Sequence, residues 1–375
     1  MQILYISSSR VPSRAANSIH VMKICSAMAN NGHEVHLMTA RAKKDTEKGV
    51  VDVFDFYGVK KNFNLYRLYW MNIPMFSIIY SLNILLIFLN LTLKNRQRPL
   101  CFSRYLHGLY LLSFFGPPLR LEMHLTLSDR KFERVIFKKL IKKSNFKKLV
   151  VISEKLAEIY INEFPELSNK IVVAHDAADI VDLNEKIQLH GNGKLNLGYV
   201  GHLYKGRGVR LMIDLVKNKS DIDLHLIGGT ENDIEFWKNE SAQFKNVHFY
   251  GFKSPKETVL YRNSCDILLA PYEKKLSIAG GDLDTSRWMS PLKIFEYMSA
   301  KKPIICSDLP VLREVLVDKQ NAILCEPESL DSWSTAVENI RRDSDLSAKI
   351  ADNAYNDFRN KYTWTQRAKL ILAGG

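Results

Sequence analysis

A short glycine-rich, basic segment has the composition of an anion-binding loop. Residues 201–208 read Gly-His-Leu-Tyr-Lys-Gly-Arg-Gly and follow an apolar run that is typical of a strand. Glycines let backbone N–H groups approach an anion closely, and a helix start adds partial positive charge. Lys205 and Arg207 add full charges. The spacing fits neither a Walker loop nor the GxGxxG dinucleotide motif, so it indicates either an anion site or a solvated turn.

A second segment, residues 290–298, reads Ser-Pro-Leu-Lys-Ile-Phe-Glu-Tyr-Met. We expect a helix to begin near Pro291, which places Lys293 in the first turn beside free backbone amides, where a phosphate fits. Glu296 lies about one turn further on and is able to accept hydrogen bonds from a diol such as a ribose. The alternative is a Lys–Glu pair on the solvated face of an ordinary helix.

Both segments belong to an alternation of strand-like and helix-like stretches, which predicts parallel sheets covered on both faces. The predicted strands of the first half are 3–7, 34–39, 100–103, 119–124, 149–153 and 171–175. After a polar linker over residues 179–194, the predicted strands are 195–200, 222–227, 247–250, 267–270, 303–307 and 321–324. The pattern predicts two doubly wound α/β domains with ligand sites at the carboxyl ends of the strands.

Taken in order along the chain, the motifs resemble those of the retaining GT-B glycosyltransferases. The resemblance is to the family 4-like group, which includes many bacterial polysaccharide and lipid-linked sugar transferases. It rests on Asn17 to Val21, Asn31 to Val35, Arg104, Glu122 to His124, Val151 to Ser153, Gly201 to Gly208, Gly251, Ala270 to Tyr272 and Ser290 to Met298.

The resemblance implies two Rossmann-like domains that face a cleft. We expect an acceptor domain over residues 1–180 and a nucleotide-sugar donor domain over 195–360. A crossover helix over 361–375 is expected to return to the first domain.

The resemblance also implies roles for particular residues. Arg207 and Lys293 would bind the diphosphate of a nucleotide sugar, Glu296 would hold the ribose hydroxyls, and His124 would lie under the donor sugar. His124, Arg207 and Lys293 are therefore the candidate catalytic residues. The other residues expected to bind the nucleotide sugar are Gly201, His202, Lys205, Gly206, Gly251, Phe252, Ser290, Pro291 and Leu292.

One position departs from the family pattern. Many members carry a second glutamate eight residues before the ribose-binding one, and this chain has Trp288 there. The sugar contact is then absent or is made by Asp282, Asp284 or Trp288. The two aspartates are interpreted as solvated loop carboxylates rather than metal ligands, because two protein cations can take the place of a metal ion.

The implied activity is metal-independent, retaining transfer of a hexose from a UDP- or GDP-linked donor, without a cofactor. The acceptor would be a saccharide or a lipid-linked sugar in the synthesis of a surface polysaccharide or glycolipid. Two alternatives stay open: a non-catalytic protein that binds nucleotide sugars, and a sugar-nucleotide epimerase or phosphorylase of the same fold.

Composition excludes several other classes. The chain of 375 residues is 46% hydrophobic and 25% charged, which fits a globular protein with a sizeable core. Five scattered cysteines argue against a disulfide framework or a zinc site. We expect no signal peptide, because Met1 leads directly into a strand-like run. The apolar stretch over residues 71–93 is interrupted by polar residues, and we expect a buried helix there rather than a membrane anchor.

Positive charge is concentrated in the first half of the chain. Residues 1–150 hold 24 Lys and Arg against 8 Asp and Glu, whereas residues 151–375 hold 29 against 32. The basic, amphipathic stretch over 130–148 either lies on anionic lipid or packs its apolar side into the core. A cytoplasmic protein is expected, with peripheral association at the inner membrane face as one alternative. No motif supports a nucleic-acid partner.

Overall fold

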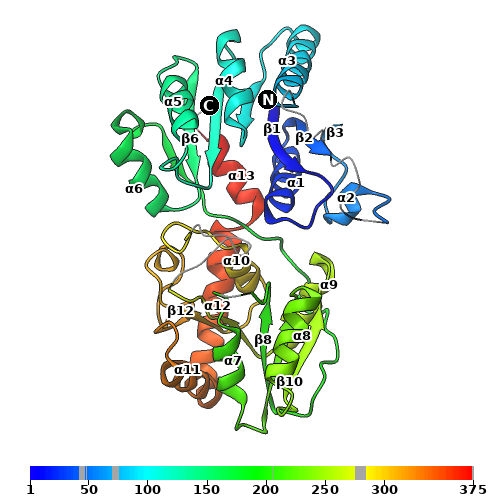
Figure 1. Ribbon diagram of the computed structural model, residues 1–375, viewed down its shortest axis with the longest axis vertical. Helices are drawn as coiled ribbons and strands as arrows, with labels where there is room; N and C mark the ends of the chain where they lie inside the picture. Colours follow the sequence, from blue (N-terminus) through cyan, green and yellow to red (C-terminus); the bar gives the residue numbers. More distant parts are fainter. Residues whose placement is uncertain (42–46, 48, 70–75, 205, 275–283, 374–375) are drawn as a thin grey trace. The chain divides into compact units, whose positions relative to one another are not determined.

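The computed structural model describes residues 1–41, 47, 49–69, 76–204, 206–274 and 284–373. The chain divides into two compact units (Figure 1). The first contains residues 1–175 together with 364–375, and the second contains residues 176–363. The last helix of the chain thus belongs to the first unit.

The first unit is built on a seven-stranded sheet with the order β3-β2-β1-β4-β5-β6-β7. Its strands are β1 (Gln2–Arg10), β2 (Glu34–Arg41), β3 (Asn64–Tyr69), β4 (Leu100–Ser103), β5 (Leu119–Met123), β6 (Phe146–Val151) and β7 (Ile171–Val173). All of their pairings are parallel, and Ile3 of β1 pairs with Val35 on one side and Leu100 on the other. A strand covered on both faces needs a continuous apolar run, which β1 and β4 supply.

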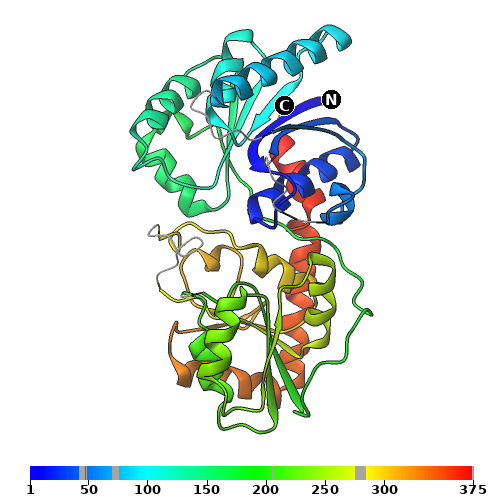
Figure 2. The same cartoon turned by 45° about the vertical axis from the view of Figure 1, so that its right-hand side comes forward.

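Helices cover both faces of this sheet (Figures 1 and 2). They are α1 (Ala16–Asn30), α2 (Val53–Phe56), α3 (Phe76–Asn95), α4 (Leu106–Leu112), α5 (Lys131–Ile141), α6 (Glu154–Glu163) and α13 (Trp364–Leu372), with 3-10 turns η1 (Ser113–Phe115) and η2 (Pro165–Leu167). The chain reverses its direction along the sheet after β3, so right-handed crossovers place α1 on one face and α3 to α6 on the other. α13 packs against α1, and α4 contacts both α3 and α5.

The second unit has a six-stranded parallel sheet with the order β10-β9-β8-β11-β12-β13. Its strands are β8 (Leu195–Val200), β9 (Ile222–Ile227), β10 (Val247–Gly251), β11 (Ile267–Ala270), β12 (Ile304–Ser307) and β13 (Ile323–Cys325). Its helices are α7 (Val209–Val216), α8 (Glu231–Glu240), α9 (Pro255–Ser264), α10 (Leu292–Ser299), α11 (Leu330–Arg342) and α12 (Ser344–Lys361), with the 3-10 turn η3 (Leu312–Glu314).

Two apolar clusters sandwich this second sheet. Alternate residues of β11 enter them: Leu268 and Ala270 join the cluster of α9, α10 and α12, whereas Ile267 and Leu269 join the cluster of α7 and α11. This alternation follows from the two-residue period of a strand. The carboxyl ends of β8, β11 and β12 therefore open into loops at one edge of the sheet.

The predicted fold class, two Rossmann-like parallel-sheet domains, is confirmed. The predicted strands are present with shifts of a few residues at their ends, and the helix expected near Pro291 begins at Leu292. Strand β3 has no counterpart among the predicted strands. It is an edge strand, and its sequence Asn-Leu-Tyr-Arg-Leu-Tyr lacks the continuous apolar run that is typical of a buried strand.

The expectation of a buried helix over residues 71–93 is wrong for the part that the structure describes. α3 occupies Phe76–Asn95, and one side of it is exposed. By length and composition alone, its segment Ile78–Asn95 is apolar enough to cross a membrane. The prediction considered only the longest unbroken apolar run, whereas the helix carries two separate apolar rows.

Candidate functional site

The glycine-rich segment connects β8 to α7 in the second unit. Gly208 is the N-cap of α7 and has the left-handed φ of 65°. A β-carbon at this position would collide with the carbonyl oxygen of Pro271, so a side chain would push the backbone away. The loop is therefore held tightly against the segment after β11, and Arg207 lies next to Tyr272. Lys205 lies outside the described residues.

Arg207 and Lys293 converge on one aromatic ring. The Cζ atom of Arg207 lies 5.7 Å from the centre of the Tyr272 ring, and the Nζ atom of Lys293 lies 5.5 Å from it. Arg207 also donates a 2.7 Å hydrogen bond from Nη2 to Tyr204 Oη. Lys293 Nζ lies 3.6 Å from the centre of the Tyr199 ring. Aromatic faces thus hold both cations at the carboxyl edge of the sheet.

Neither cation forms an ion pair with a carboxylate in the described part of the chain. Burial, followed by the charge of Arg207, holds the pKa of Lys293 well below its ordinary range. Arg207 Nε and the hydroxyl of Tyr272 are buried and have no hydrogen-bond partner among the described residues. An anion at this place would relieve the repulsion between the two cations.

Lys293 is the second residue of α10, whose N-cap is Pro291. Its amine lies against Gly201, where a β-carbon would come within 2.9 Å of Nζ. The first glycine of the loop therefore leaves the space that the lysine side chain fills. The first-turn amides of α10 add to the positive field around that amine.

Glu296 is positioned by a buried arginine that sequence inspection did not identify. Arg262 on α9 lies 3.3 Å from Glu296 through Nη1 and Oε2, and the same nitrogen donates to Thr258 Oγ1 at 3.0 Å. The Arg262 side chain is 4% exposed, whereas that of Glu296 is 37% exposed. The carboxylate is thus fixed on one side and open to a hydroxyl ligand on the other.

The remaining predicted nucleotide-sugar residues have varied environments. His202 and Phe252 are exposed, and Gly206 is buried. Gly251 ends β10 and accepts a 2.8 Å backbone hydrogen bond from Gly228. Ser290 Oγ accepts a 2.8 Å hydrogen bond from the backbone N–H of Asp176, so this side chain supports the chain before α10. Leu292 is the first residue of that helix.

The three tentative sugar contacts remain predictions. Asp282 lies outside the described residues. Asp284 accepts a 2.9 Å hydrogen bond from the backbone N–H of Ser286, which stabilises a local turn. Trp288 follows in the same turn and is only 7% exposed, so it offers little surface to a ligand.

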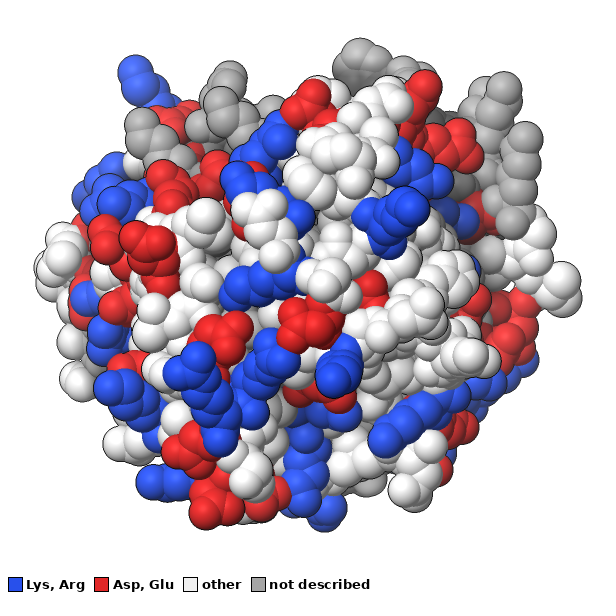
Figure 3. Space-filling model, turned by 90° about the horizontal axis from the view of Figure 1, so that it is seen from below, with Lys and Arg blue, Asp and Glu red and all other residues white. Residues whose placement is uncertain are grey.

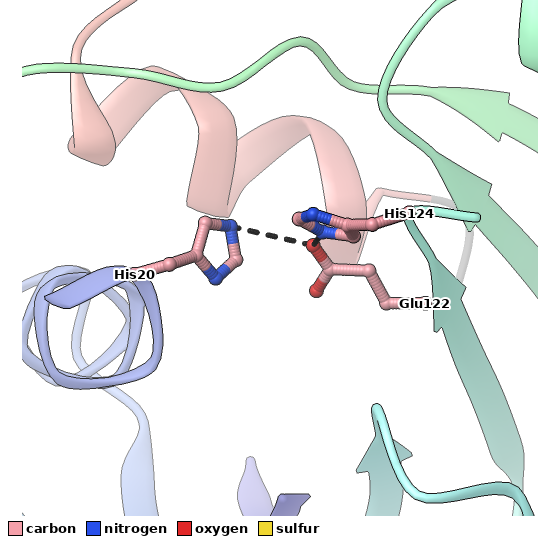
Figure 4. A group of neighbouring side chains, drawn as sticks. All are labelled: His20, Glu122 and His124. Atoms are coloured by element: carbon pink, nitrogen blue, oxygen red, sulfur yellow. Dashed lines mark hydrogen bonds and ion pairs between the residues drawn. The ribbon is translucent and has the colours of Figure 1, made fainter. Parts of the chain in front are cut away.

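In the first unit, His124 belongs to a buried polar cluster around Glu122 (Figure 4). Glu122 Oε1 lies 2.7 Å from His124 Nε2, 3.3 Å from His20 Nε2 and 2.8 Å from Arg367 Nη2. Tyr5 donates a 3.2 Å hydrogen bond to Oε2. The members come from β1, α1, the end of β5 and α13. We call these five residues the Glu122 cluster.

Opposing effects set the charge of this cluster. Burial raises the pKa of Glu122, but the Arg367 charge, His20 and the hydrogen bond from His124 together bring it well below its ordinary range. Burial lowers the pKa of His20 well below 6.5, against the pull of Glu122. The carboxylate is thus ionised and orients His124, whose side chain is 19% exposed.

His20, Glu122 and His124 are also spaced closely enough to hold a metal ion. A cation there would compete with Arg367, whose guanidinium already binds the Oε1 atom that faces both histidines. The donor set therefore fits a charge-balanced hydrogen-bond network better than a metal centre. The predicted absence of a metal stays a prediction.

Comparison with known proteins places the second unit in a family. Residues 181–357 match the family described as glycosyl transferases group 1. The chain is 23% identical over 249 residues to an uncharacterized glycosyltransferase of Methanocaldococcus jannaschii, covering 64% of this chain and 60% of the relative. It is 27% identical over 116 residues to the O-antigen chain mannosyltransferase RfbU of Salmonella typhimurium, covering 31% of this chain and 30% of RfbU. The chain thus matches about three fifths of the length of the first relative.

Solved structures share the fold over the whole chain. A glycosyltransferase from Rickettsia africae superposes with a TM-score of 0.72 at 13% identity, covering 100% of this chain and 99% of the other. The Anabaena protein HepE, solved in complex with UDP, superposes with a TM-score of 0.67 at 14% identity, covering 99% and 98%. At these identities the likeness shows the fold. Together with the family match, it confirms the predicted GT-B resemblance.

Proposed function

We propose that this chain transfers a sugar from a nucleotide diphosphate sugar to a saccharide or lipid-linked acceptor, because residues 181–357 match the glycosyl transferases group 1 and the chain shares the GT-B fold of solved glycosyltransferases. The donor would be a UDP- or GDP-linked hexose, and the anomeric configuration would be retained. The proposed place of this reaction is the synthesis of a surface polysaccharide or glycolipid. RfbU, which acts on the O-antigen chain by its name, supports that setting.

The observation that carries the proposal is the uncompensated pair of Arg207 and Lys293 around Tyr272. A pyrophosphate supplies the negative charge that the described residues around this pair do not. Glu296, fixed by Arg262 and partly open, suits the hydroxyls of the adjoining ribose. HepE, of the same fold, was solved with UDP.

Such a pair favours the transition state over the ground state. As the glycosidic bond breaks, its electron pair stays on the phosphate oxygen, and the leaving nucleoside diphosphate gains negative charge. Cations placed beforehand near that oxygen stabilise the developing charge, and they do so without a metal ion. The sugar then has oxocarbenium character. The acceptor hydroxyl bonds to the anomeric carbon, and its proton passes to the leaving phosphate.

His124 is proposed to contact the donor sugar. Its orientation by the ionised Glu122 supports this role, since a fixed imidazole offers its other nitrogen in one direction. Trp288 stands where many relatives carry a glutamate, and Asp282 and Asp284 remain the proposed replacements for that sugar contact.

We place the protein in the cytoplasm, at the inner face of the membrane when its acceptor is lipid-linked. The basic first half of the chain supports an anionic surface as a partner. No nucleic acid and no cofactor are included in the proposal.

Calorimetric titration with UDP and GDP tests the nucleotide site. We expect Arg207→Ala and Lys293→Ala each to weaken binding of the preferred nucleotide by ~10- to 100-fold, as is typical when a charged hydrogen-bond partner is lost. Arg210→Ala is the matched control, because Arg210 follows Arg207 by three residues, is exposed and is paired with Glu240 of α8. Equal affinity of all three variants and the parent would contradict the assignment.

Trp288 in place of a glutamate keeps a non-catalytic nucleotide-sugar-binding protein as the second candidate. Incubation with UDP- and GDP-sugars separates the two, since an enzyme hydrolyses its donor slowly without an acceptor and a binding protein leaves it intact. A same-fold epimerase would instead convert the sugar while it stays attached to the nucleotide.

A further inference from the structure

Helix α3 of the first unit exposes a row of large apolar side chains. The members of this exposed row are Ile78, Leu82, Leu86, Leu89 and Leu93, which are between 38% and 78% exposed. Steps of three and four residues keep them on one side of the helix. Single exposed leucines are common, but a continuous row over a 20-residue helix is not explained by chance exposure.

The opposite side of α3 is apolar as well. Tyr80, Ile84, Phe88 and Leu91 are at most 3% exposed and belong to the core of the first unit. A helix that packs on a sheet ordinarily presents a polar outer face to water. The inner row also shows that α3 cannot leave the unit to span a bilayer without opening its core, so the outer row needs a partner at the surface.

Exposed apolar side chains also lie on η1 and α5, which follow α3 in the chain. Phe88 on α3 has its ring centre 6.3 Å from that of Phe115 in η1, which follows α4 directly. Phe114 beside it is exposed and carries Lys143 Nζ 4.1 Å above its ring. On α5, Phe132 and Val135 are both more than half exposed, although Phe137, Leu140 and Ile141 enter the core.

Cations border this surface. Residues 76–148 contain 14 Lys and Arg but only three Asp and Glu, and one of the three is the buried Glu122. Basic residues follow the exposed row at the end of α3 and lie along α5 and just after it: Lys94, Arg96, Arg98, Lys131, Arg134, Lys138, Lys139, Lys142 and Lys143. Seen from below, by contrast, Figure 3 shows blue and red side chains intermixed.

We propose that this face, formed by the exposed row of α3 with Phe114, Phe132 and Val135, docks on a bilayer that contains anionic lipid. The leucines enter the boundary between headgroups and acyl chains, and the surrounding lysines and arginines bind the phosphates. The inference rests on the proposed function in one respect: the lipid-linked acceptor explains why the protein would dock on a membrane. The evidence for the docking face itself comes from the first unit alone. The proposal assigns the apolar contact with the bilayer to α3, and not to the basic helix α5 by itself.

Vesicle flotation tests the docking face. We expect the parent to bind phosphatidylcholine vesicles that contain phosphatidylglycerol, and to retain part of this binding at about 1 M salt, where charge attraction is screened. The triple variant Leu82→Ser/Leu86→Ser/Leu93→Ser is expected to bind at least ~10-fold more weakly. The control Ile180→Ser/Phe236→Ser/Val317→Ser removes exposed apolar residues of the second unit and is expected to bind like the parent.

A probe reports the depth of contact. All five native cysteines are buried, so Leu86→Cys introduces one accessible thiol for an environment-sensitive dye. Its emission is expected to shift to the blue on anionic vesicles, whereas a dye at Phe236→Cys is expected not to shift. UDP and GDP titrations of the triple variant show separately whether nucleotide binding is intact.

Three results would overturn the proposal: no binding of the parent to anionic vesicles, equal binding of the α3 triple variant, or complete loss of parent binding at high salt. The proposal would also be overturned if the parent formed dimers in solution and did not bind vesicles, and if the triple substitution dissociated those dimers. In that case a second copy of the chain covers the face. Failure to bind either nucleotide, with vesicle binding intact, would instead count against the proposed function.

Discussion

Glu122 is the carboxylate that joins the other four residues of the Glu122 cluster in the first unit. It accepts from Arg367, His124 and Tyr5 at 2.8, 2.7 and 3.2 Å, and His20 lies 3.3 Å away. A buried ion pair of this kind adds little net stability by itself, but removing one partner leaves an uncompensated charge. The effect of Glu122 on the stability of the fold is therefore largest when one of its partners is replaced.

We predict that Arg367→Met lowers the free energy of unfolding by ~3–5 kcal/mol near neutral pH. In the parent the pKa of Glu122 is depressed, so its stabilising contribution is present above its ordinary pKa of 4.5 and is lost as the pH falls through the depressed value. In the variant, burial dominates and raises this pKa. The ionised carboxylate then destabilises the fold increasingly as the pH rises.

Urea unfolding of parent and variant at about pH 5 and about pH 7.5 checks this prediction. The difference between them is expected to be smaller at the lower pH, where Glu122 of the variant takes up a proton. Arg359→Met is the control, because Arg359 is exposed on α12. An equal difference at both pH values would contradict the assigned charge state.

Residues of the candidate site could be predicted where they lie in one short motif. Arg207, Lys293 and Glu296 were identified from segments 201–208 and 290–298. Tyr272, which lies between the two cations, and Arg262, which fixes Glu296, were assigned no role, because their contacts join segments that are far apart in the chain. The same holds for the partners of His124.

At the scale of elements, the loop between β8 and α7 depends on a close backbone contact. We predict that Gly208→Ala lowers the melting temperature and weakens UDP or GDP binding by ~10-fold or more, because its β-carbon would collide with the Pro271 carbonyl oxygen and move Arg207. Thermal unfolding and calorimetry measure the two effects.

Gly32→Ala is the matched control for this loop. Gly32 also has a positive φ, 84°, but no atom lies within 4 Å of an added β-carbon. Its cost is limited to the backbone conformation, about 1–2 kcal/mol, and nucleotide binding is expected to stay unchanged. If both variants behaved alike, the collision with Pro271 would not be the cause.

Elements were predictable to different degrees. A buried parallel strand such as β11 has the continuous apolar run that identifies it, and the N-cap Ser254 with Pro255 at the first helical position marks the start of α9. α3 shows where this reasoning fails. The sequence of α3 shows that the helix is apolar, and we predicted that the whole helix is buried. Only its packing against the sheet shows which of its two apolar rows is covered.

For the whole molecule, the cysteines offer a direct check of both cores. Burial raises the pKa of all five thiols, to about 12 for Cys265 and Cys325. Thiolates are the reactive form, so we predict no rapid reaction with Ellman's reagent in the native protein and five equivalents after unfolding. Rapid reaction of one thiol in the native state would mean that its core opens readily.

The arrangement of two Rossmann-like units was the most predictable feature, since the alternation of strands and helices runs through nearly the whole chain. The position of the boundary between the units was less predictable. The second unit begins at residue 176, whereas the polar composition predicted a linker over residues 179–194. The return of α13 to the first unit came from the family resemblance, because nothing in a short apolar helix indicates which sheet it joins.

The position of Arg367 also has a consequence for synthesis on the ribosome. Arg367 is translated 245 residues after Glu122, with the entire second unit in between. The nascent first unit must therefore wait, with a carboxylate in its interior that lacks its guanidinium, until the whole second unit has been translated. Only when α13 has left the exit tunnel is the charge of Glu122 balanced by Arg367.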